Sequence, residues 1–193
     1  MLILVTNRKL CRDDFLQRIG ELAKGKPHAI MLREKDLSLV EYENLASAVN
    51  EICAANDVML IINQNISVAK KLKLANIHLS MSDLRKFRHD LRHFTGIGAS
   101  VHSVSEAVKA QELGASYVIA GHIFSTDCKK GVPPRGLSFL TEVCDTVTIP
   151  VFAIGGISQN NLKQIAATGA TGWCIMSQAM TCLNPENISS VFQ

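Results

Sequence analysis

Residues 150–177 read PVFAIGGISQNNLKQIAATGATGWCIMS and decide the fold. Two short apolar runs, 150–155 and 172–177, flank a stretch near 159–168 in which apolar residues recur at helical spacing. Gly169 stands where that helix should stop. A strand, a helix and a second strand in this order are typical of parallel sheets. The stretch therefore predicts a βαβ unit near the end of the chain.

The same alternation extends over the whole chain. Six further apolar runs have the length of strands: 2–6, 28–33, 58–63, 76–80, 96–101 and 117–121. Helical stretches lie near 13–24, 38–55, 65–73, 83–92, 103–113 and 136–145, and a short closing helix is expected after Pro185. Eight such units favour an α/β fold, a (β/α)8 TIM barrel that forms a single domain over residues 1–193. The alternative is an open doubly wound sheet.

Composition and charge exclude several classes of protein. Of the residues, 47% are hydrophobic and 19% charged, so the chain can bury a core and is not expected to be disordered. No apolar run approaches the ~18–20 residues of a membrane span. A net charge of +3 suits small anionic ligands but not nucleic acid. The short apolar start predicts a strand and not a signal peptide, hence a cytoplasmic protein. A homo-oligomer stays open.

The six cysteines, at positions 11, 53, 128, 144, 174 and 182, form no Cys-x-x-Cys pair. In a protein without an export signal they are expected to be reduced thiols and not a disulfide framework. His, Asp and Glu residues do not cluster at metal-ligand spacing either. We therefore expect neither a metal nor another cofactor.

Polar residues gather where the strands are predicted to end, which is the active-site face of a parallel barrel. Arg33 and Lys35 are two apart, so on an extended strand end both side chains face one side and Glu34 faces the other. Two cations at the barrel mouth should attract phosphate, pyrophosphate or a carboxylate. The alternative is a solvated run of charges.

Gly155 and Gly156 follow the seventh strand, and Met176 and Ser177 end the eighth. In phosphate-binding barrels, backbone N–H groups in the loops after these two strands hold the phosphate. Glycine lets the main chain approach the anion closely. The four residues therefore predict a phosphate site, and the alternative is a tight strand-to-helix turn.

His122 lies directly after the sixth strand, in GHIFSTDCKK at 121–130. A histidine pKa near ~6.5 suits proton transfer in both directions, so His122 is the candidate acid/base, against the alternative of a structural surface histidine. Thr126 and Lys129 in the same loop are candidate substrate contacts, against a plain surface loop. His78 is expected to be a hydrogen-bonded core histidine, and His102 is a second acid/base candidate.

Together these motifs resemble the thiamine phosphate synthase superfamily over nearly the whole chain. The matching pieces, in order, are LREK at 32–35, IN at 62–63, IHL at 77–79 with Asp83, GASVHS at 98–103, residues 121–129, AIGGI at 153–157 and MS at 176–177. The superfamily has the (β/α)8 fold. The resemblance adds Asn63 and Ser100 to the candidate substrate-binding residues.

A few positions separate two branches of the superfamily. In the synthases, a carboxylate after the strand-3 asparagine helps to hold magnesium with a second aspartate after strand 4. Here Gln64 replaces the first acid, whereas Asp83 matches the second. The stretch 121–131 instead resembles the TenI branch of thiazole tautomerases, which implies that His122 is the proton-transfer group.

The expected function is therefore that of an isomerase of thiamine biosynthesis, a metal-independent thiazole tautomerase. It would aromatise a thiazole carboxylate phosphate, a small phosphorylated thiazole substrate. One alternative is a thiamine phosphate synthase that joins hydroxymethylpyrimidine diphosphate to thiazole phosphate. Another is a non-catalytic regulatory or phosphate-ligand-binding barrel, although no DNA-reading motif supports direct gene regulation.

Overall fold

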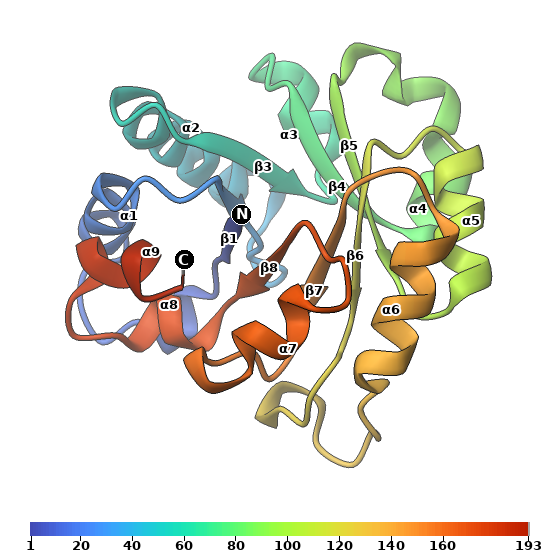
Figure 1. The fold of residues 1–193 in the computed structure, drawn as a ribbon. Helices are drawn as coiled ribbons and strands as arrows, with labels where there is room; N and C mark the ends of the chain where they lie inside the picture. Colours follow the sequence, from blue (N-terminus) through green and yellow to red (C-terminus); the bar gives the residue numbers. More distant parts are fainter. Residues whose placement is uncertain (193) are drawn as a thin grey trace. The chain divides into compact units, whose positions relative to one another are not determined.

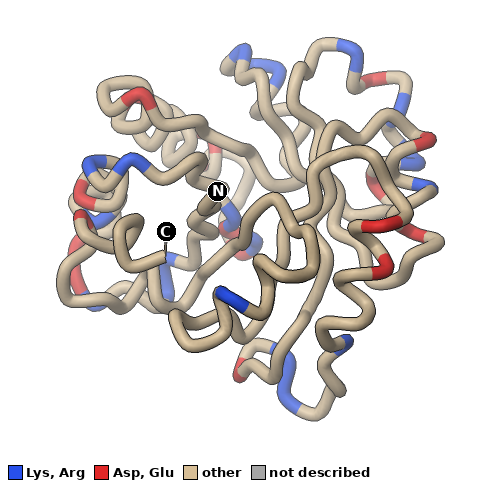
Figure 2. Tube along the Cα trace, viewed as in Figure 1, with Lys and Arg blue, Asp and Glu red and all other residues tan. Residues whose placement is uncertain are grey.

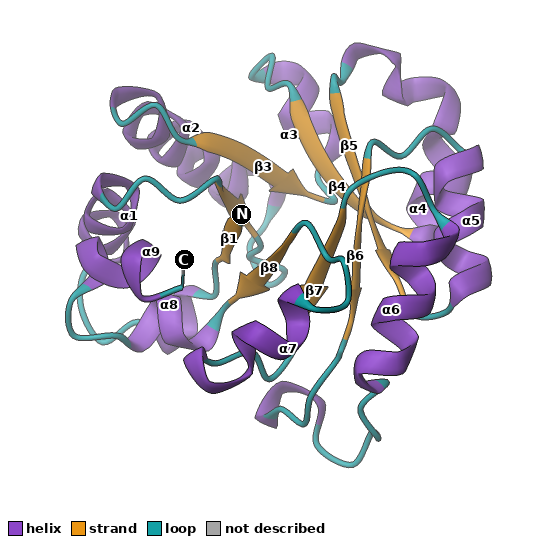
Figure 3. Ribbon diagram, in the orientation of Figure 1, coloured by secondary structure: helices purple, strands orange, loops and turns teal. Residues whose placement is uncertain are grey.

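In a computed structural model that describes residues 1–192, eight strands form a closed parallel barrel in chain order (Figures 1 and 3). The strands are β1 Leu2–Val5, β2 Ala29–Leu32, β3 Met59–Asn63, β4 Asn76–Ser80, β5 Gly96–Val101, β6 Tyr117–Gly121, β7 Val151–Ile154 and β8 Gly172–Ile175. The predicted TIM barrel is confirmed, and the open sheet is excluded because the strand order closes on itself.

Helices follow each strand, as the alternation predicts. They are α1 Phe15–Lys24, α2 Leu39–Ala55, α3 Ile66–Lys71, α4 Met81–Phe87, α5 Val104–Glu112, α6 Gly136–Thr146, α7 Leu162–Ala166, α8 Ser177–Thr181 and α9 Ile188–Val191. Short 3₁₀ segments complete them: η1 Arg8–Leu10, η2 Arg88–His93, η3 Asp127–Lys129, η4 Gln159–Asn161 and η5 Pro185–Asn187.

Several predicted elements have different boundaries in the structure, among them the helices 83–92 and 159–168 and the strand 172–177. The predicted helix 83–92 is α4 continued by η2, and 159–168 is η4 followed by α7. The apolar run 172–177 is strand only to Ile175, and Ser177 begins α8. An apolar run shows that residues are buried, but it does not show where strand pairing stops.

Polar side chains set several helix starts. Ser38 accepts a hydrogen bond from the Glu41 N–H, and the Glu41 carboxylate reaches back to the Ser38 N–H, so α2 begins with a full capping box. At α5, Ser103 accepts from the Glu106 N–H, but the Glu106 carboxylate accepts from the N–H of His102. The side chain therefore reaches one residue further back than the capping-box motif predicts.

The chain divides into two compact units. The first runs from Met1 to Ile77 and continues from Ile175, and the second is His78–Cys174. In the first unit β1, β2 and β3 pair in parallel, with Ile3 opposite Ala29 and Ala29 opposite Met59. β1 and β2 are buried along their whole length, which explains why they read as continuous apolar runs.

In the second unit β5, β6 and β7 pair in parallel, and β7 pairs with residues 172–174 of β8. The predicted single domain over the whole chain stays a prediction. Within residues 1–192, none of the helices combines the length and the apolar character that a membrane span requires. The six cysteines are all free thiols in the structure, in agreement with the sequence.

Candidate active site

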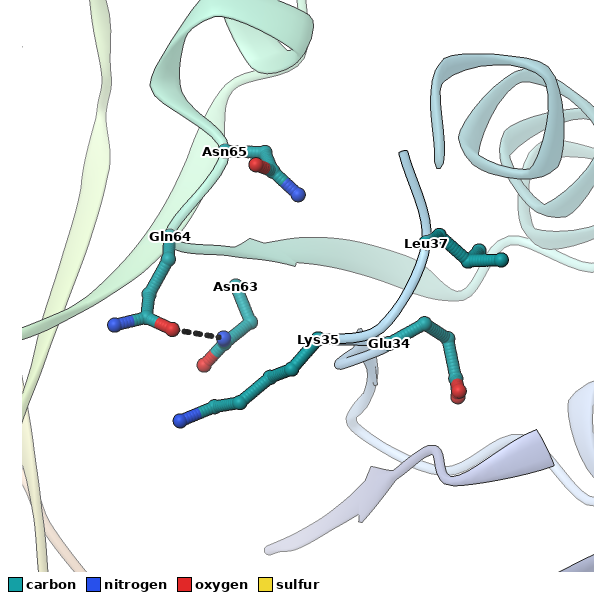
Figure 4. Close-up of a pocket in the computed structure, with 6 residues that line it drawn as sticks. All are labelled: Glu34, Lys35, Leu37, Asn63, Gln64 and Asn65. Atoms are coloured by element: carbon teal, nitrogen blue, oxygen red, sulfur yellow. Dashed lines mark hydrogen bonds between the residues drawn. The ribbon is translucent and has the colours of Figure 1, made fainter. Parts of the chain in front are cut away.

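In the first unit a pocket lies at the carboxyl ends of β2 and β3 (Figure 4). Its volume is about 230 Å³, and its lining residues are Glu34, Lys35, Leu37, Asn63, Gln64 and Asn65. The structure thus brings together Lys35 and Asn63, two of the predicted substrate-binding residues. Arg33, the other predicted cation, lies two residues before Lys35, is half-buried and is not among the residues that line this pocket.

Glu34 and Lys35 leave the end of β2 in opposite directions, as the two-residue period predicts (Figure 4). The Lys35 ammonium extends toward the amides of Asn63 and Gln64. The Glu34 carboxylate is only 4% exposed and points away from them. Of the two charged groups, the ammonium of Lys35 is therefore the one directed toward the pocket amides.

The Glu34 carboxylate accepts hydrogen bonds from the segment that follows β1 and so holds it in place. Its Oε1 accepts hydrogen bonds from the Thr6 hydroxyl (2.7 Å) and from the Arg8 N–H (3.0 Å). Its Oε2 accepts from the same N–H (3.1 Å) and from Arg8 Nη1 (3.3 Å). Four contacts on two oxygens give this carboxylate a structural role, because it satisfies donors on a neighbouring strand end.

Asp36 is paired with the same arginine. Arg8 Nη1 and Nη2 donate to its two oxygens at 2.6 and 2.8 Å, and Lys9 Nζ lies 2.9 Å from Oδ2. The hydrogen bonds from Arg8 and then Lys9 hold the pKa of Asp36 well below its usual range. Both acids that flank Lys35 in the chain, Glu34 and Asp36, therefore form ion pairs with Arg8.

Three consecutive amide side chains lie at the end of β3: Asn63 is its last residue, and Gln64 and Asn65 follow it. Asn63 Nδ2 donates to Gln64 Oε1 at 3.2 Å (Figure 4). Gln64 has a φ of +66°, in the left-handed region. From the sequence, Gln64 is notable only because it replaces a carboxylate that the synthases have at this position. Its place beside Lys35 could have been inferred from the adjacency of β2 and β3 in the barrel.

In the second unit His122 is buried, with 8% of its surface exposed, so the alternative of a surface histidine is wrong. Its Nε2 lies 3.2 Å from the carbonyl oxygen of Val132. A carbonyl oxygen can only accept, so Nε2 is the donor in this contact. The Arg135 N–H donates to the His122 carbonyl at 2.9 Å. His122 thus anchors the loop between β6 and α6 at two points.

Gly155 and Gly156 pack against this same loop. Both have positive φ, +99° and +65°. A Cβ on Gly155 would run into the His122 side chain, and one on Gly156 would run into the Ser125 carbonyl oxygen. The Phe124 N–H donates to the Gly155 carbonyl at 3.0 Å. The glycine pair is therefore required by close packing, whatever anion it binds.

Replacing Gly156 by alanine is expected to lower the free energy of unfolding, measured in urea, by more than the same change at Gly131. Both glycines have positive φ, so both variants carry the left-handed penalty of about 1–2 kcal/mol. Nothing lies within 4 Å of a Cβ at Gly131, whereas at Gly156 it meets the Ser125 carbonyl. We expect a further loss of about 1 kcal/mol or more at Gly156. Equal losses would contradict the packing argument.

Ser100, another predicted substrate-binding residue, is held by a buried histidine. His78 Nε2 lies 2.8 Å from Ser100 Oγ, and His78 Nδ1 lies 3.3 Å from the Tyr117 hydroxyl. Tyr117 also packs edge-on against Phe152, with ring centroids 5.8 Å apart. The prediction of a hydrogen-bonded core histidine at His78 is confirmed. Nothing in the local sequence indicates Tyr117, which lies 39 positions away.

The protein has two tyrosines, Tyr42 and Tyr117, and burial raises the pKa of both phenols above the usual value of about 10. The unfolded chain loses these protons first, so stability should fall as pH rises above about 10, by about 1.4 kcal/mol per pH unit for each tyrosine. The native protein should show no phenolate absorbance at 295 nm at pH 10. Tyr117→Phe and Tyr42→Phe should each halve the absorbance change on unfolding in alkali, and a native phenolate signal at pH 10 would be the contrary result.

The remaining predicted residues lie at loop positions. Thr126 precedes η3 and accepts from the Cys128 N–H at 3.4 Å. Lys129 is exposed on the loop between β6 and α6, where Figure 2 shows a run of basic residues. His102 Nδ1 lies 2.8 Å from the Gly121 carbonyl oxygen. These contacts position the loop residues, and their roles toward a substrate stay predictions.

Met176 precedes α8 and Ser177 is the exposed first residue of that helix. They belong to the first unit, and Gly155 and Gly156 belong to the second. The predicted phosphate site therefore stays a prediction.

Comparison with known proteins gives a consistent result. Residues 2–179 match the family model described as thiamine monophosphate synthase. A thiamine-phosphate synthase of Fusobacterium nucleatum is 37% identical over 177 residues, which cover 90% of this chain and 86% of the relative. One from Clostridium novyi is 36% identical over 180 residues, covering 91% and 88%. A thiamine phosphate pyrophosphorylase structure from Pyrococcus furiosus has a TM-score of 0.88 at 26% identity, covering 99% of this chain and 92% of that one.

These relatives overturn the expected thiazole tautomerase and its classification as an isomerase. Similarity to proteins named as synthases covers about nine tenths of the chain. The prediction of a tautomerase rests only on residues 121–131 and on Gln64. The structure supplies a physical reason for the error. His122 and the loop around it make packing contacts with Val132, Arg135 and Gly155, so this motif can be shaped by packing rather than by one reaction.

Proposed function

The chain belongs to the thiamine monophosphate synthase family, and from this membership we propose that it is a thiamine-phosphate synthase, a transferase that joins hydroxymethylpyrimidine diphosphate to thiazole phosphate. The observation that carries the proposal is the 34–37% identity to synthases over nine tenths of the chain or more. The cationic, amide-lined pocket in the first unit agrees with a substrate that bears a diphosphate.

The reaction makes one bond and breaks one. A thiazole ring nitrogen bonds to the methylene carbon of the pyrimidine, and the bond from that carbon to the diphosphate oxygen breaks. The diphosphate leaves with the electron pair, so negative charge grows on the leaving oxygen. Groups that meet this charge in the transition state accelerate the reaction.

In this proposal Lys35 meets the leaving diphosphate. Its ammonium extends into the pocket beside the amides of Asn63 and Gln64, whose N–H groups can donate to phosphate oxygens. Arg33 adds a second cation at the same strand end. The network of Glu34 with Thr6 and Arg8 fixes the backbone from which Lys35 projects.

The candidate residues of the second unit keep proposed roles in substrate binding. Ser100, oriented by His78, is proposed as a ring contact. Gly155 and Gly156, with Thr126 and Lys129 on the neighbouring loop, are proposed to bind the thiazole phosphate through backbone N–H groups, a hydroxyl and an ammonium. These roles are extensions of the family resemblance.

The direct test is to incubate the purified protein with both substrates and to measure thiamine phosphate and pyrophosphate. We expect the two products in a 1:1 ratio, with formation that depends on both substrates and on protein concentration. A folded protein that forms neither product, with and without added Mg²⁺, would refute the proposal.

A further inference from the structure

The family resemblance implies a magnesium ion held by two carboxylates, one at position 64 and one at position 83. The first donor is changed in this chain. Gln64 offers a neutral amide, and its Oε1 already accepts a hydrogen bond from Asn63 at 3.2 Å. Mg²⁺ is usually held in proteins by carboxylates together with substrate phosphates. An amide supplies an oxygen, but it supplies no charge.

Other carboxylates do not replace the missing one. Glu34 lines the same pocket, but its two oxygens accept four hydrogen bonds from Thr6 and Arg8. In the second unit Asp83 lies in the first turn of α4 and pairs with the N-cap residue Ser80: the Asp83 N–H donates to Ser80 Oγ at 3.1 Å, and Ser80 Oγ donates to Asp83 Oδ2 at 2.7 Å. Within residues 1–192, no three His, Cys, Asp or Glu side chains are grouped to hold a metal ion. The residues present do not fit the implied site.

The loss of the carboxylate at position 64 changes the charge that a bound diphosphate would meet in this pocket. A carboxylate at position 64 would repel a bound diphosphate unless a cation lay between them. Gln64 removes that repulsion, so the cation is no longer needed to offset it. Glu34 is turned away and paired to Arg8, whereas the ammonium of Lys35 extends toward the amides, where it can meet a bound anion.

We propose that this pocket binds the diphosphate without magnesium, with Lys35 and the Asn63 and Gln64 amides in place of the metal site. The proposal rests on the proposed function for the identity of the anion. It goes beyond that function in one respect: the synthase reaction would run without a divalent cation, because Lys35 would supply the positive charge that meets the diphosphate.

The backbone at position 64 allows a sharp test. Its φ of +66° is a conformation that aspartate and asparagine adopt more readily than most residues. Gln64→Asp and Gln64→Asn should therefore both fold. They have nearly the same shape and differ by one negative charge, which makes them a matched pair.

The experiment is calorimetric titration with inorganic pyrophosphate in EDTA and in excess Mg²⁺, corrected for the Mg²⁺ that pyrophosphate binds in solution. For the wild type we expect dissociation constants that agree within roughly threefold in the two conditions. Gln64→Asp should bind at least roughly tenfold more weakly in EDTA and recover in Mg²⁺. Gln64→Asn should show no Mg²⁺ effect, whatever its affinity. Lys35→Met should lose binding in both conditions.

Wild-type binding that requires Mg²⁺ would overturn the inference, and so would wild-type protein that makes thiamine phosphate yet binds no pyrophosphate in either condition. Synthase activity in EDTA would support it. Metal-independent pyrophosphate binding by a protein that forms no thiamine phosphate would support the anion site and refute the proposed function, so the two failures are distinguishable.

Discussion

Replacing Lys35 by methionine is expected to lower kcat/KM for thiamine phosphate formation by roughly 10²–10³-fold, the usual effect of removing one preorganised group that stabilises transition-state charge. Lys35 extends toward the pocket amides, and the neighbouring acids Glu34 and Asp36 are already committed to Arg8. Methionine keeps most of the length of the lysine stem and removes only the charge and its N–H donors. The loss should therefore appear without a change in urea midpoint.

Two variants control this prediction. Lys71→Met removes a lysine of the same unit that is 67% exposed and paired with Glu43, so its kcat/KM should stay within about twofold of wild type. Lys35→Arg keeps the charge in a different geometry and should retain more activity than Lys35→Met. If Lys35→Met and Lys71→Met had the same activity, Lys35 would not contact the diphosphate.

The barrel could be predicted from the sequence because its signal is local. Strands buried on both faces, such as β1 and β2, appear as continuous apolar runs, and the helices between them appear as a change of period. The boundary differs at β8, where the predicted strand runs to position 177 but the strand ends at Ile175 and Ser177 begins α8.

The pocket was only partly predictable. The opposite directions of Glu34 and Lys35 follow from their spacing alone. The contacts of Glu34 with Thr6 and Arg8 join residues 26–28 positions apart, and no local pattern indicates which donor a buried carboxylate will find. The same holds for His78 and Tyr117.

The function was misassigned because single positions were weighted above the whole chain. Gln64 alone does not argue against a synthase, because a neutral residue removes both the metal ligand and the repulsion that the metal offsets. His122 Nε2 lies 3.2 Å from the Val132 carbonyl oxygen, and a role of His122 in proton transfer stays a prediction. A residue type constrains the chemistry of a site only after its neighbours are known.

Replacing Glu34 by alanine is expected to lower the free energy of unfolding by about 3 kcal/mol, because the buried Thr6 hydroxyl and the part-buried Arg8 N–H lose their shared acceptor, although the Arg8 side chain keeps Asp36. The Glu34 side chain is 2% exposed and that of Arg8 is 30% exposed. In the variant the Thr6 hydroxyl and the Arg8 N–H would lose the carboxylate oxygen to which both donate hydrogen bonds. Urea unfolding measures the loss, and pyrophosphate affinity should fall with it because Lys35 follows Glu34 in the chain.

Two matched variants separate the charge of Glu34 from its shape and its site. Asp36→Ala removes the exposed acid that shares Arg8 and should shift the urea midpoint far less, since exposed pairs contribute little. Glu34→Gln keeps one acceptor oxygen for Thr6 but no charge for Arg8, so its stability should lie between those of wild type and Glu34→Ala. Glu34→Ala as stable as Asp36→Ala would mean that the segment after β1 finds other acceptors, and Glu34 would then not be what holds Lys35 in place.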